Sequence, residues 1–497
     1  MTKKKEKQNL INRPPVVVVL GHVDHGKSSL LEAIRDFKIT SKESGGITQH
    51  IGAYEVEHDG KKITFIDTPG HEAFCAMRSR GARIADIAIL VVAGEEGVKP
   101  QTKEAIDCIK EEKIPAILAI NKMDKQEANA QKVKSALTKE NFIVEDMGGD
   151  IPSVETSATQ KTGIKELLEM IILVAEMQDL KTDADTQAKG TVIETHIDEK
   201  RGSTAILLVQ QGTLNLKDIV ATPTVCGKIK KMEDFVGDMV NEAPPSKPVA
   251  VLGFESLPKI GEQFEVFESI EKAKEYIMTA EPKMKETVEE AGGKKALKII
   301  IKTDVLGSLE AIEKMINDLP QDEITIQILK SGAGLISEDD VQMAYTSGAK
   351  IFSFHTAPSG SAANLANQKA VKILSYEVIY ELIDNLKKAM KSTVESETIR
   401  RDLGKLKILK VFRTEKERQI VGGSVIEGEV LNSARIEVLR NDEIIGRGRA
   451  DQLQKEKKNV EKGVIDDEVG ILYIGNGKIQ EGDILQFFVE EKKKFEF

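Results

Sequence analysis

Gly21-His22-Val23-Asp24-His25-Gly26-Lys27-Ser28 is the stretch that decides the fold of the first third of the chain. It matches the pattern G-x-x-x-x-G-K-[ST], follows the apolar run Val16–Leu20, and precedes a helical pattern that starts near Ser28. In this setting the backbone amides of the loop surround phosphate groups, Lys27 reaches the terminal phosphates, and Ser28 binds Mg²⁺. The stretch predicts a P-loop domain whose phosphate-binding residues are Gly21 to Ser28.

Short Val/Ile-rich runs alternate with helical patterns on both sides of this loop. Such alternation predicts a largely parallel sheet covered by helices. The runs are Val16–Leu20, Ile63–Ile66, Ala88–Val92, Ile117–Ile120 and Ser153–Thr156.

A second motif, Asp67-Thr68-Pro69-Gly70, follows the run Ile63–Ile66. Here a carboxylate can hold Mg²⁺ and a glycine amide can sense the terminal phosphate. Thr48, in the glycine-rich segment Ser44–Thr48, can add a hydroxyl to the same metal. We expect Ser28, Thr48 and Asp67 to bind the metal, and both segments to be switches that respond to loss of the terminal phosphate.

The identity of the base is predicted by Asn121-Lys122-Met123-Asp124, at the end of the run Ile117–Ile120. A carboxylate accepts hydrogen bonds from N1 and the exocyclic amine of guanine, whereas adenine has no such pair of donors. Asp124 therefore favours GTP over ATP, and Ser157-Ala158-Thr159 would complete the pocket. The alternative, that these motifs are ordinary turns, does not explain their shared order at successive strand ends.

His71 directly follows the second motif and completes the predicted phosphate-binding set. It is the best candidate catalytic residue, orienting the attacking water, because hydrolysis mainly needs positioning and charge stabilisation. The alternative is a purely structural histidine. No arginine finger is obvious in the sequence, so we expect slow intrinsic hydrolysis that a partner accelerates.

The whole chain reads as an α/β multidomain protein. Beyond a polar linker, Lys181–Lys189, short alternating strands indicate a β-barrel, followed by a second region of alternating strands and helices. Apolar residues then recur at helical spacing from Val378 to Met390. We expect a basic N-terminal tail at 1–12, a GTP-binding domain at 13–181, a β-barrel at 188–270, an α/β/α sandwich at 285–374, a connecting helix at 375–402 and a C-terminal β-barrel at 403–497.

The two predicted barrels echo each other. Gly261–Phe267 in the first is matched by Glu481–Phe487 in the second, and each follows an apolar run. We infer two related barrels; a shared strand–turn–strand habit is the alternative.

Composition limits the class of protein. The 497 residues include no apolar run of the roughly 20 residues that a membrane helix needs, and no secretion signal is recognisable. Three widely spaced cysteines argue against a disulfide framework and a zinc site. The net charge of −10 means that any RNA contact must be local. We expect a cytoplasmic monomer with no membrane contact.

Longer stretches resemble the bacterial initiation factor two family of translational GTPases. They are Arg13–Lys27, Gly45–Tyr54, Asp67–Phe74, Lys302–Ala311 and Ser331–Val341, and the resemblance covers nearly the whole chain from Arg13. The motif Gly21–Lys27 is shared by translational GTPases generally, whereas Gly45–Tyr54 is much narrower.

The resemblance implies a role and partners. The family uses GTP and Mg²⁺ to promote binding of formylmethionyl initiator tRNA to the small ribosomal subunit, and then subunit joining with GTP hydrolysis stimulated by the large subunit. By analogy, His71 is the catalytic histidine, while Val23 and Ile47 resemble the apolar gate that holds it away from the water.

Two departures from the family stand out. Only about twelve residues precede Arg13, where the family commonly has a long extension, so a short form is expected. The initiator-binding surface of the family would map to Gly423, Lys455, Glu468 and Val469, of which Glu468 alone keeps the residue of the family.

Basic residues cluster around the last barrel, where phosphate contact is one reading and a solvated charged face the other. Two other functions also stay open: a GTP-dependent ribosome- or tRNA-binding module with altered formyl selectivity, and a different translational GTPase.

Overall fold

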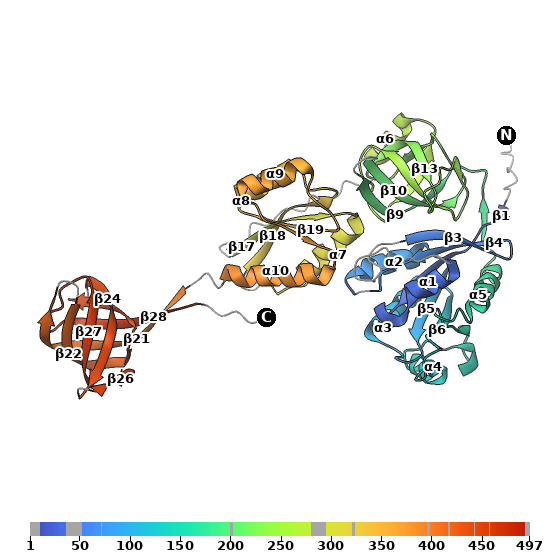
Figure 1. The fold of residues 1–497 in the computed structure, drawn as a ribbon. Helices are drawn as coiled ribbons and strands as arrows, with labels where there is room; N and C mark the ends of the chain where they lie inside the picture. Colours follow the sequence, from blue (N-terminus) through green and yellow to red (C-terminus); the bar gives the residue numbers. More distant parts are fainter. Residues whose placement is uncertain are drawn as a thin grey trace. The chain divides into compact units, whose positions relative to one another are not determined.

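The structure is a computed structural model that describes residues 10–35, 52–70, 72–198, 202–279, 295–320, 324–394, 398–415, 418–441, 443–456 and 458–492. The chain divides into two compact units, Met1–Leu386 and Lys387–Phe497 (Figure 1). Within the described ranges, no helix combines the length and apolar composition needed to cross a bilayer. Cys75, Cys108 and Cys226 are free thiols, as expected.

The first domain is built on a six-stranded sheet in the order β3-β4-β2-β5-β6-β7. Neighbouring strands are parallel except for the β3–β4 hairpin, which confirms the predicted parallel sheet. Its strands are β2 Val16–Gly21, β3 Gly52–His58, β4 Lys61–Asp67, β5 Ile87–Ala93, β6 Ala116–Asn121 and β7 Ser153–Glu155. The sequence reading missed β3 because this edge strand is only half-buried and lacks a continuous apolar run.

Helices cover both faces of this sheet (Figure 1). Val17 and Val19 of β2 pack with α1 Lys27–Arg35 and α5 Ile164–Met177. Val18 points to the other face, where it lies next to Gly81 of α2 Cys75–Ile84. The remaining helices are α3 Pro100–Glu112 and α4 Ala130–Lys139. Because both faces are covered, every residue of β2 and β5 is buried, and each strand reads as a continuous apolar run.

The N-terminal tail and the linker, both expected to be irregular, instead form two short strands that pair with each other. Leu10–Asn12 forms β1, which pairs antiparallel with β8 Lys181–Asp183. Directly after β1, both terminal guanidinium nitrogens of Arg13 donate to the carboxylate of Asp86 at 2.6 Å. The expected tail therefore ends before Leu10, and the expected linker begins as a strand, because backbone pairing gives such short segments an order that their side chains do not signal.

The two barrels share one topology. Numbered along the chain, the six main strands of each barrel follow the order 2-5-4-3-6-1 around it. In the first barrel they are β9 Lys189–Asp198, β10 Gly202–Gln211, β12 Ile219–Ala221, β13 Cys226–Glu233, β15 Pro248–Phe254 and β16 Gln263–Phe267, with β11 Leu214–Asn215 and β14 Glu242–Ala243 as a side ribbon. In the second they are β21 Thr398–Thr414, β22 Arg418–Leu431, β23 Arg435–Arg440, β24 Glu443–Lys455, β27 Glu468–Gly475 and β28 Ile484–Lys492, with β25 Lys458–Asn459 and β26 Lys462–Val464 beside them. This shared order supports the inference of two related barrels.

Between the barrels, a short helix α6 Ile270–Thr279 precedes an α/β/α sandwich. Its parallel sheet has the order β18-β17-β19-β20, with α8 and α9 on one face and α7 and α10 on the other (Figure 1). The elements are β17 Lys295–Thr303, α7 Leu306–Asn317, β18 Ile324–Ala333, α8 Glu338–Ser347, β19 Lys350–Phe354, α9 Gly360–Lys369 and β20 Ile373–Tyr376. On the α8 side, the fully buried Asp340 forms ion pairs with Lys302 at 3.2 Å and Lys330 at 2.6 Å.

The connecting helix is shorter than the expected range 375–402. Helix α10 spans Ile379–Val394, and the chain continues as strand β21 from Thr398. Apolar residues at three- and four-residue steps, including Leu382 and Leu386, are buried as the pattern predicts.

Candidate functional site

The loop after β2 can form only with glycine at two positions. Gly21 has φ 142° and Gly26 has φ 81°, both in the region that favours glycine. A Cβ on Gly21 would collide with the carbonyl oxygen of Val91, and one on Gly26 would lie 2.6 Å from Nδ2 of Asn121. The backbone between β2 and α1 is therefore held tightly against β5 and β6.

Lys27 lies between this loop and the Asp67–Gly70 motif. Its buried Nζ donates to the carbonyl oxygens of Gly21 at 3.1 Å and His22 at 2.8 Å. A Cβ on Gly70 would meet the same ammonium. Burial lowers the pKa of Lys27 to about 8, while the carboxylate of Asp67 opposes this shift. The ammonium thus stays mostly charged at pH 7 at the place where the two predicted phosphate-binding segments meet.

The Asp67–Gly70 motif is fixed from both sides. Asp67 ends β4 and is 2% exposed, and the hydroxyl of Thr68 donates to the carbonyl of Val19 at 2.9 Å. Nη1 of the buried Arg78 donates to the carbonyl of Pro69 at 3.3 Å. The sequence reading missed Arg78, because an arginine inside helix α2 gives no signal that it turns back onto the motif.

The predicted guanine-binding segments are joined by hydrogen bonds. Nδ2 of the buried Asn121 donates to the carbonyls of His25 at 3.0 Å and Gly26 at 3.3 Å, and its Oδ1 accepts from the amide of Ala158 at 3.2 Å. Asn121 therefore ties the phosphate loop to the loop after β7. This bridging contact was not predicted.

Of the other predicted members, Ser157 is buried, whereas Lys122 and Asp124 are half-buried. The hydroxyl of Ser157 donates to the Asp124 carboxylate at 2.6 Å, a bond that lowers the pKa of Asp124. Lys122 pairs with Glu95 at 3.0 Å, and Thr159 is exposed. Asp124 is thus held ionised next to the bridged loops.

The middle of the phosphate loop is anchored by unpredicted partners. The amide of Val23 donates to Oε1 of Gln101 in α3 at 3.2 Å. His25 is fully buried with Nδ1 3.3 Å from the carbonyl oxygen of Val91, and burial, aided by the neighbouring His22, lowers the pKa of His25 to about 4. Asp24, by contrast, is exposed.

Three predicted residues lie outside the described part of the chain: Ile47, Thr48 and His71. Their roles as gate, metal ligand and catalytic residue stay predictions. The described oxygen donors, the Ser28 hydroxyl at the start of α1 and the buried Asp67 carboxylate beside Lys27, are the hard ligands that Mg²⁺ prefers. The residues at this site fit a magnesium nucleotide.

In the C-terminal barrel, the four residues mapped to an initiator-binding surface lie on neighbouring strands but do not all face solvent. The register pairs Gly423 with Val469 and Ser424 with Glu468. Val469 is 3% exposed in the barrel core, and Gly423 is buried against Leu406, so the expectation of surface positions is corrected for these two.

Glu468 and Lys455 do have exposed or half-exposed side chains, but Lys455 pairs with Asp467. The accessible part of the mapped surface therefore carries an acidic group and a neutralised lysine.

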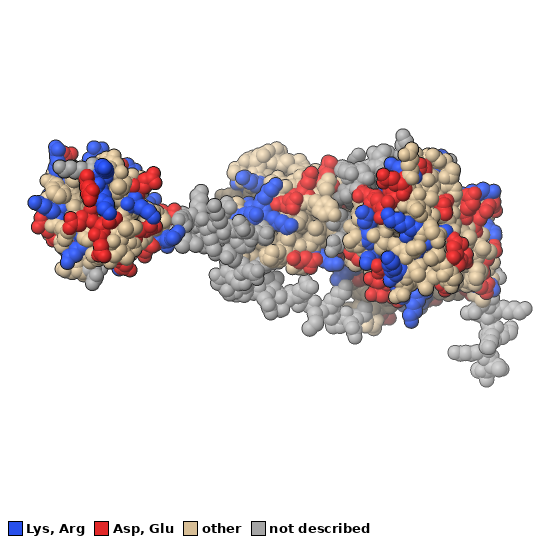
Figure 2. All heavy atoms as spheres, turned by 90° about the horizontal axis from the view of Figure 1, so that it is seen from below, with Lys and Arg blue, Asp and Glu red and all other residues tan. Residues whose placement is uncertain are grey.

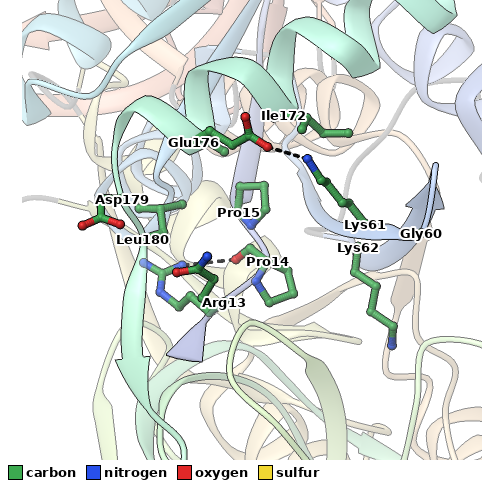
Figure 3. A pocket seen from close by; sticks show the side chains of 12 residues that line it. Arg13, Pro14, Pro15, Gly60, Lys61, Lys62, Ile172, Glu176, Asp179 and Leu180 are labelled. Atoms are coloured by element: carbon green, nitrogen blue, oxygen red, sulfur yellow. Dashed lines mark hydrogen bonds and ion pairs between the residues drawn. The ribbon is translucent and has the colours of Figure 1, made fainter. Parts of the chain in front are cut away.

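A cavity of about 430 Å³ lies elsewhere in the first domain, beside Arg13–Pro15, the β3–β4 turn and the end of α5 (Figure 3). It is at the amino end of β2, opposite to the end that carries the phosphate loop. Lys61 and Glu176, which line it, form an ion pair. This cavity is separate from the predicted nucleotide site.

The strand order and the three motifs at the carboxyl ends of β2, β4 and β6 define a P-loop nucleotide-binding protein. Comparison with known protein families supports a GTP-binding domain. Residues 12–177 match the elongation factor Tu GTP binding domain, residues 187–267 match elongation factor G domain 2, and residues 271–387 match translation-initiation factor 2. The class is therefore that of the translation factors with a GTP-binding domain.

The chain belongs to the translation initiation factor IF-2 family. The IF-2 of Dehalococcoides mccartyi is 42% identical, over 99% of this chain and 84% of its own length. The IF-2 of Pelotomaculum thermopropionicum is 45% identical, over 98% of this chain and 52% of its own length. The IF-2 of Desulforamulus reducens is 42% identical, over 99% of this chain and 51% of its own length. The chain thus spans about half the length of the latter two relatives. The crystal structure of GDP-bound aIF5B from Aeropyrum pernix aligns with 96% of this chain and 92% of that chain, at 27% identity and a TM-score of 0.46.

Proposed function

We propose that this protein is a GTP-hydrolysing initiation factor that promotes binding of formylmethionyl initiator tRNA to the small ribosomal subunit, and then subunit joining, in the cytoplasm. One observation carries the proposal. Asn121 hydrogen-bonds both the loop after β2 and the loop after β7, so the segments predicted to bind the phosphates and the base are directly joined. Family membership connects that site to initiation.

The substrate would be held at both ends by charged groups. The Lys27 ammonium and the loop amides from Gly21 to Ser28 would neutralise the phosphates of GTP. The Asp124 carboxylate, ionised and oriented by Ser157, would accept from N1 and the amine of guanine. ATP lacks this pair of donors, so GTP should bind selectively.

Ser28 and Asp67, with Thr48 of the first switch segment, would hold Mg²⁺. When bound, the metal supplies positive charge that stabilises the phosphoryl oxygens. Gly70 and Thr48 would respond to the presence of the terminal phosphate, which makes the site a switch.

Hydrolysis would depend on His71 to orient the attacking water, with Val23 and Ile47 as the apolar gate that restrains it until the ribosome engages. The prediction is that His71→Ala abolishes ribosome-stimulated GTP hydrolysis, since positioning is lost, while GTP affinity stays within about twofold. Phosphate release with and without ribosomes measures this. His58→Ala, on the β3–β4 hairpin, is the matched control, and stimulation that survives in the His71 variant would refute the assignment.

Helix α2, which follows the second motif, contacts the sandwich and lies close to the first barrel. Arg80 of α2 pairs with Glu310 of α7 at 2.8 Å, and a Cβ on Gly307 would meet both Met77 of α2 and Glu194 of the first barrel. A shift of α2 on loss of the terminal phosphate would therefore press on the barrel and the sandwich together.

A second candidate is a GTP-dependent tRNA-binding module without formyl selectivity. The buried Gly423 and Val469 and the neutralised Lys455 favour it, because they leave few free polar groups on the mapped surface. GTP-dependent binding of formylated and unformylated initiator tRNA to the small subunit separates the two: equal binding removes formyl recognition.

A further inference from the structure

Three side chains that can ligate a metal meet where the β3–β4 hairpin turns beside helix α5. One ring nitrogen of His58 and one carboxylate oxygen each of Asp59 and Glu169 all lie within 4.8 Å of one another. His58 ends β3, Asp59 begins the turn, and Glu169 lies on α5. In the described part of the chain, this is the one group of three or more such ligands.

The turn and an ion pair fix the tip of this hairpin on α5. Asp59 and Gly60 have φ of 49° and 74°, and two such residues in succession form the two-residue turn that is typical of tight hairpins. At the start of β4, Lys61 forms an ion pair with Glu176 of α5 (Figure 3). The hairpin is thus held against the helix that supplies Glu169, and ordered elements position all three ligands.

His58 contributes a ring nitrogen that is buried but has no partner. The side chain of His58 is 16% exposed, and its Nε2 forms no hydrogen bond with any residue of the described ranges. Oδ2 of Asp59 is 3.6 Å from this nitrogen, beyond hydrogen-bond distance. Buried polar atoms in proteins rarely stay without a partner. A cation between the imidazole and the carboxylates would supply one.

Acidic side chains alone would not mark a site on this surface. Asp and Glu are scattered among Lys and Arg over the visible faces of both units (Figure 2). Glu169 pairs with Lys165 of the same helix at 3.4 Å, and both side chains are more than half exposed. Such a surface pair contributes little to stability, so Glu169 can exchange Lys165 for a stronger partner. The buried imidazole is what distinguishes this cluster.

The mixture of ligands selects the class of cation. Mg²⁺ and Ca²⁺ prefer sites made of oxygen alone, whereas an imidazole nitrogen favours metals such as Zn²⁺. Donor atoms around a tetrahedral Zn²⁺ lie about 3.4 Å apart. The distance of 3.6 Å between Nε2 of His58 and Oδ2 of Asp59 is already close to this value. Rotation of the exposed carboxylates would complete a set of one nitrogen and two oxygens, with water as the fourth ligand.

We propose that His58, Asp59 and Glu169 form a Zn²⁺ site that joins the β3–β4 hairpin to helix α5. Strand β3 lies at the edge of the six-stranded sheet, and bound Zn²⁺ would attach this edge to the helix that covers the sheet. The turn borders the cavity at the amino end of β2, opposite to the phosphate loop. The assignment therefore does not depend on the proposed function, and His58→Ala removes no group of the nucleotide site.

Titration calorimetry with Zn²⁺ tests the site in the full chain, without nucleotide and with Mg²⁺ in excess to fill sites made of oxygen alone. His58→Gln and Glu169→Gln should each weaken one Zn²⁺-binding step at least about 100-fold, because losing even a group that only orients a ligand costs roughly 10- to 100-fold. Glu166→Gln removes another exposed carboxylate of α5 and is the matched control, so it should bind Zn²⁺ like wild type. Equal affinity in all four proteins, no saturable step in wild type, or full competition by Mg²⁺ overturns the site.

Hydrogen exchange and thermal unfolding locate the bound cation. Zn²⁺ should slow amide exchange in the β3–β4 hairpin and around Glu169 in wild type, and leave exchange in Glu169→Gln unchanged. Zn²⁺ should also raise the unfolding midpoint of wild type and Glu166→Gln by a few degrees but not that of Glu169→Gln, since a ligand that binds only the folded state stabilises it. Without Zn²⁺ the three proteins should unfold alike, which separates lost binding from lost folding. Protection confined to another part of the chain would refute the assignment.

Discussion

Replacing Asp124 by Asn should convert the nucleotide site from one that selects guanine to one that selects xanthine. Xanthine carries a carbonyl where guanine carries its exocyclic amine, and an asparagine amide can donate to that carbonyl. The Asn side chain keeps an oxygen that can accept from Ser157, which bonds Asp124 at 2.6 Å. The substitution therefore changes the chemistry of the base contact while keeping the local connection between the two loops.

The magnitude follows from the bonds lost. A hydrogen bond to a charged group is worth about 1.5–3 kcal/mol, and guanine would lose two such bonds to the carboxylate. A loss of about 3–6 kcal/mol corresponds to roughly 10²- to 10⁴-fold weaker binding of GTP. XTP, by contrast, should bind the variant more tightly than it binds wild type.

Equilibrium titration with fluorescent GTP, competed by unlabelled GTP, XTP or ATP, measures these affinities. Asp146→Asn is a suitable control, because Asp146 is an exposed carboxylate of the same domain that pairs with Lys134 away from the base loops. The reasoning would be refuted if Asp124→Asn bound GTP within about threefold of wild type, or if it gained nothing with XTP.

Three further predictions concern stability. The imidazole of His25 should titrate near pH 4 by NMR. Because this pKa lies below the ordinary value of 6.5, the contribution of His25 to stability is present above pH 6.5 and is lost as the pH falls towards 4. A titration midpoint above pH 6 would contradict the burial of the ring. Asp340→Asn should destabilise the first unit by about 3–5 kcal/mol in urea unfolding at pH 7, because it leaves buried positive charge unpaired. The pKa of wild-type Asp340 is about 2, below the ordinary value of 3.8, so part of this loss of stability should vanish as the pH falls from about 4 to 2. A loss of stability that does not change with pH would argue against the ion pairs. Gly21→Ala should cost about 1–3 kcal/mol of stability and impair nucleotide binding, because φ of 142° and the Val91 carbonyl both exclude a Cβ, so a variant as stable as wild type would show that the loop is less constrained.

The sequence by itself determined the fold classes and located the candidate nucleotide site. The phosphate loop, the Asp67–Gly70 motif and the Asn121–Asp124 motif are local patterns at strand ends, and in a parallel sheet consecutive strands place such ends at one edge. Apolar runs and turn spacing likewise distinguished the domains with helix-covered sheets from the barrels. The period and length of an apolar run reflect which faces of a helix or strand are buried. The echo between Gly261–Phe267 and Glu481–Phe487 pointed to two barrels that prove to share a strand order.

Only the tertiary structure decided which way particular side chains point. Arg78 and Asn121 serve the site through contacts with residues distant in sequence, and no local pattern encodes such contacts. Val469 was mapped to a surface only by resemblance to the family, yet the barrel places its side chain in the core. A one-residue bulge of β21 against β22 has the opposite effect at Phe412, which is 63% exposed, because side chains alternate across a strand and an extra residue changes which face the next one occupies.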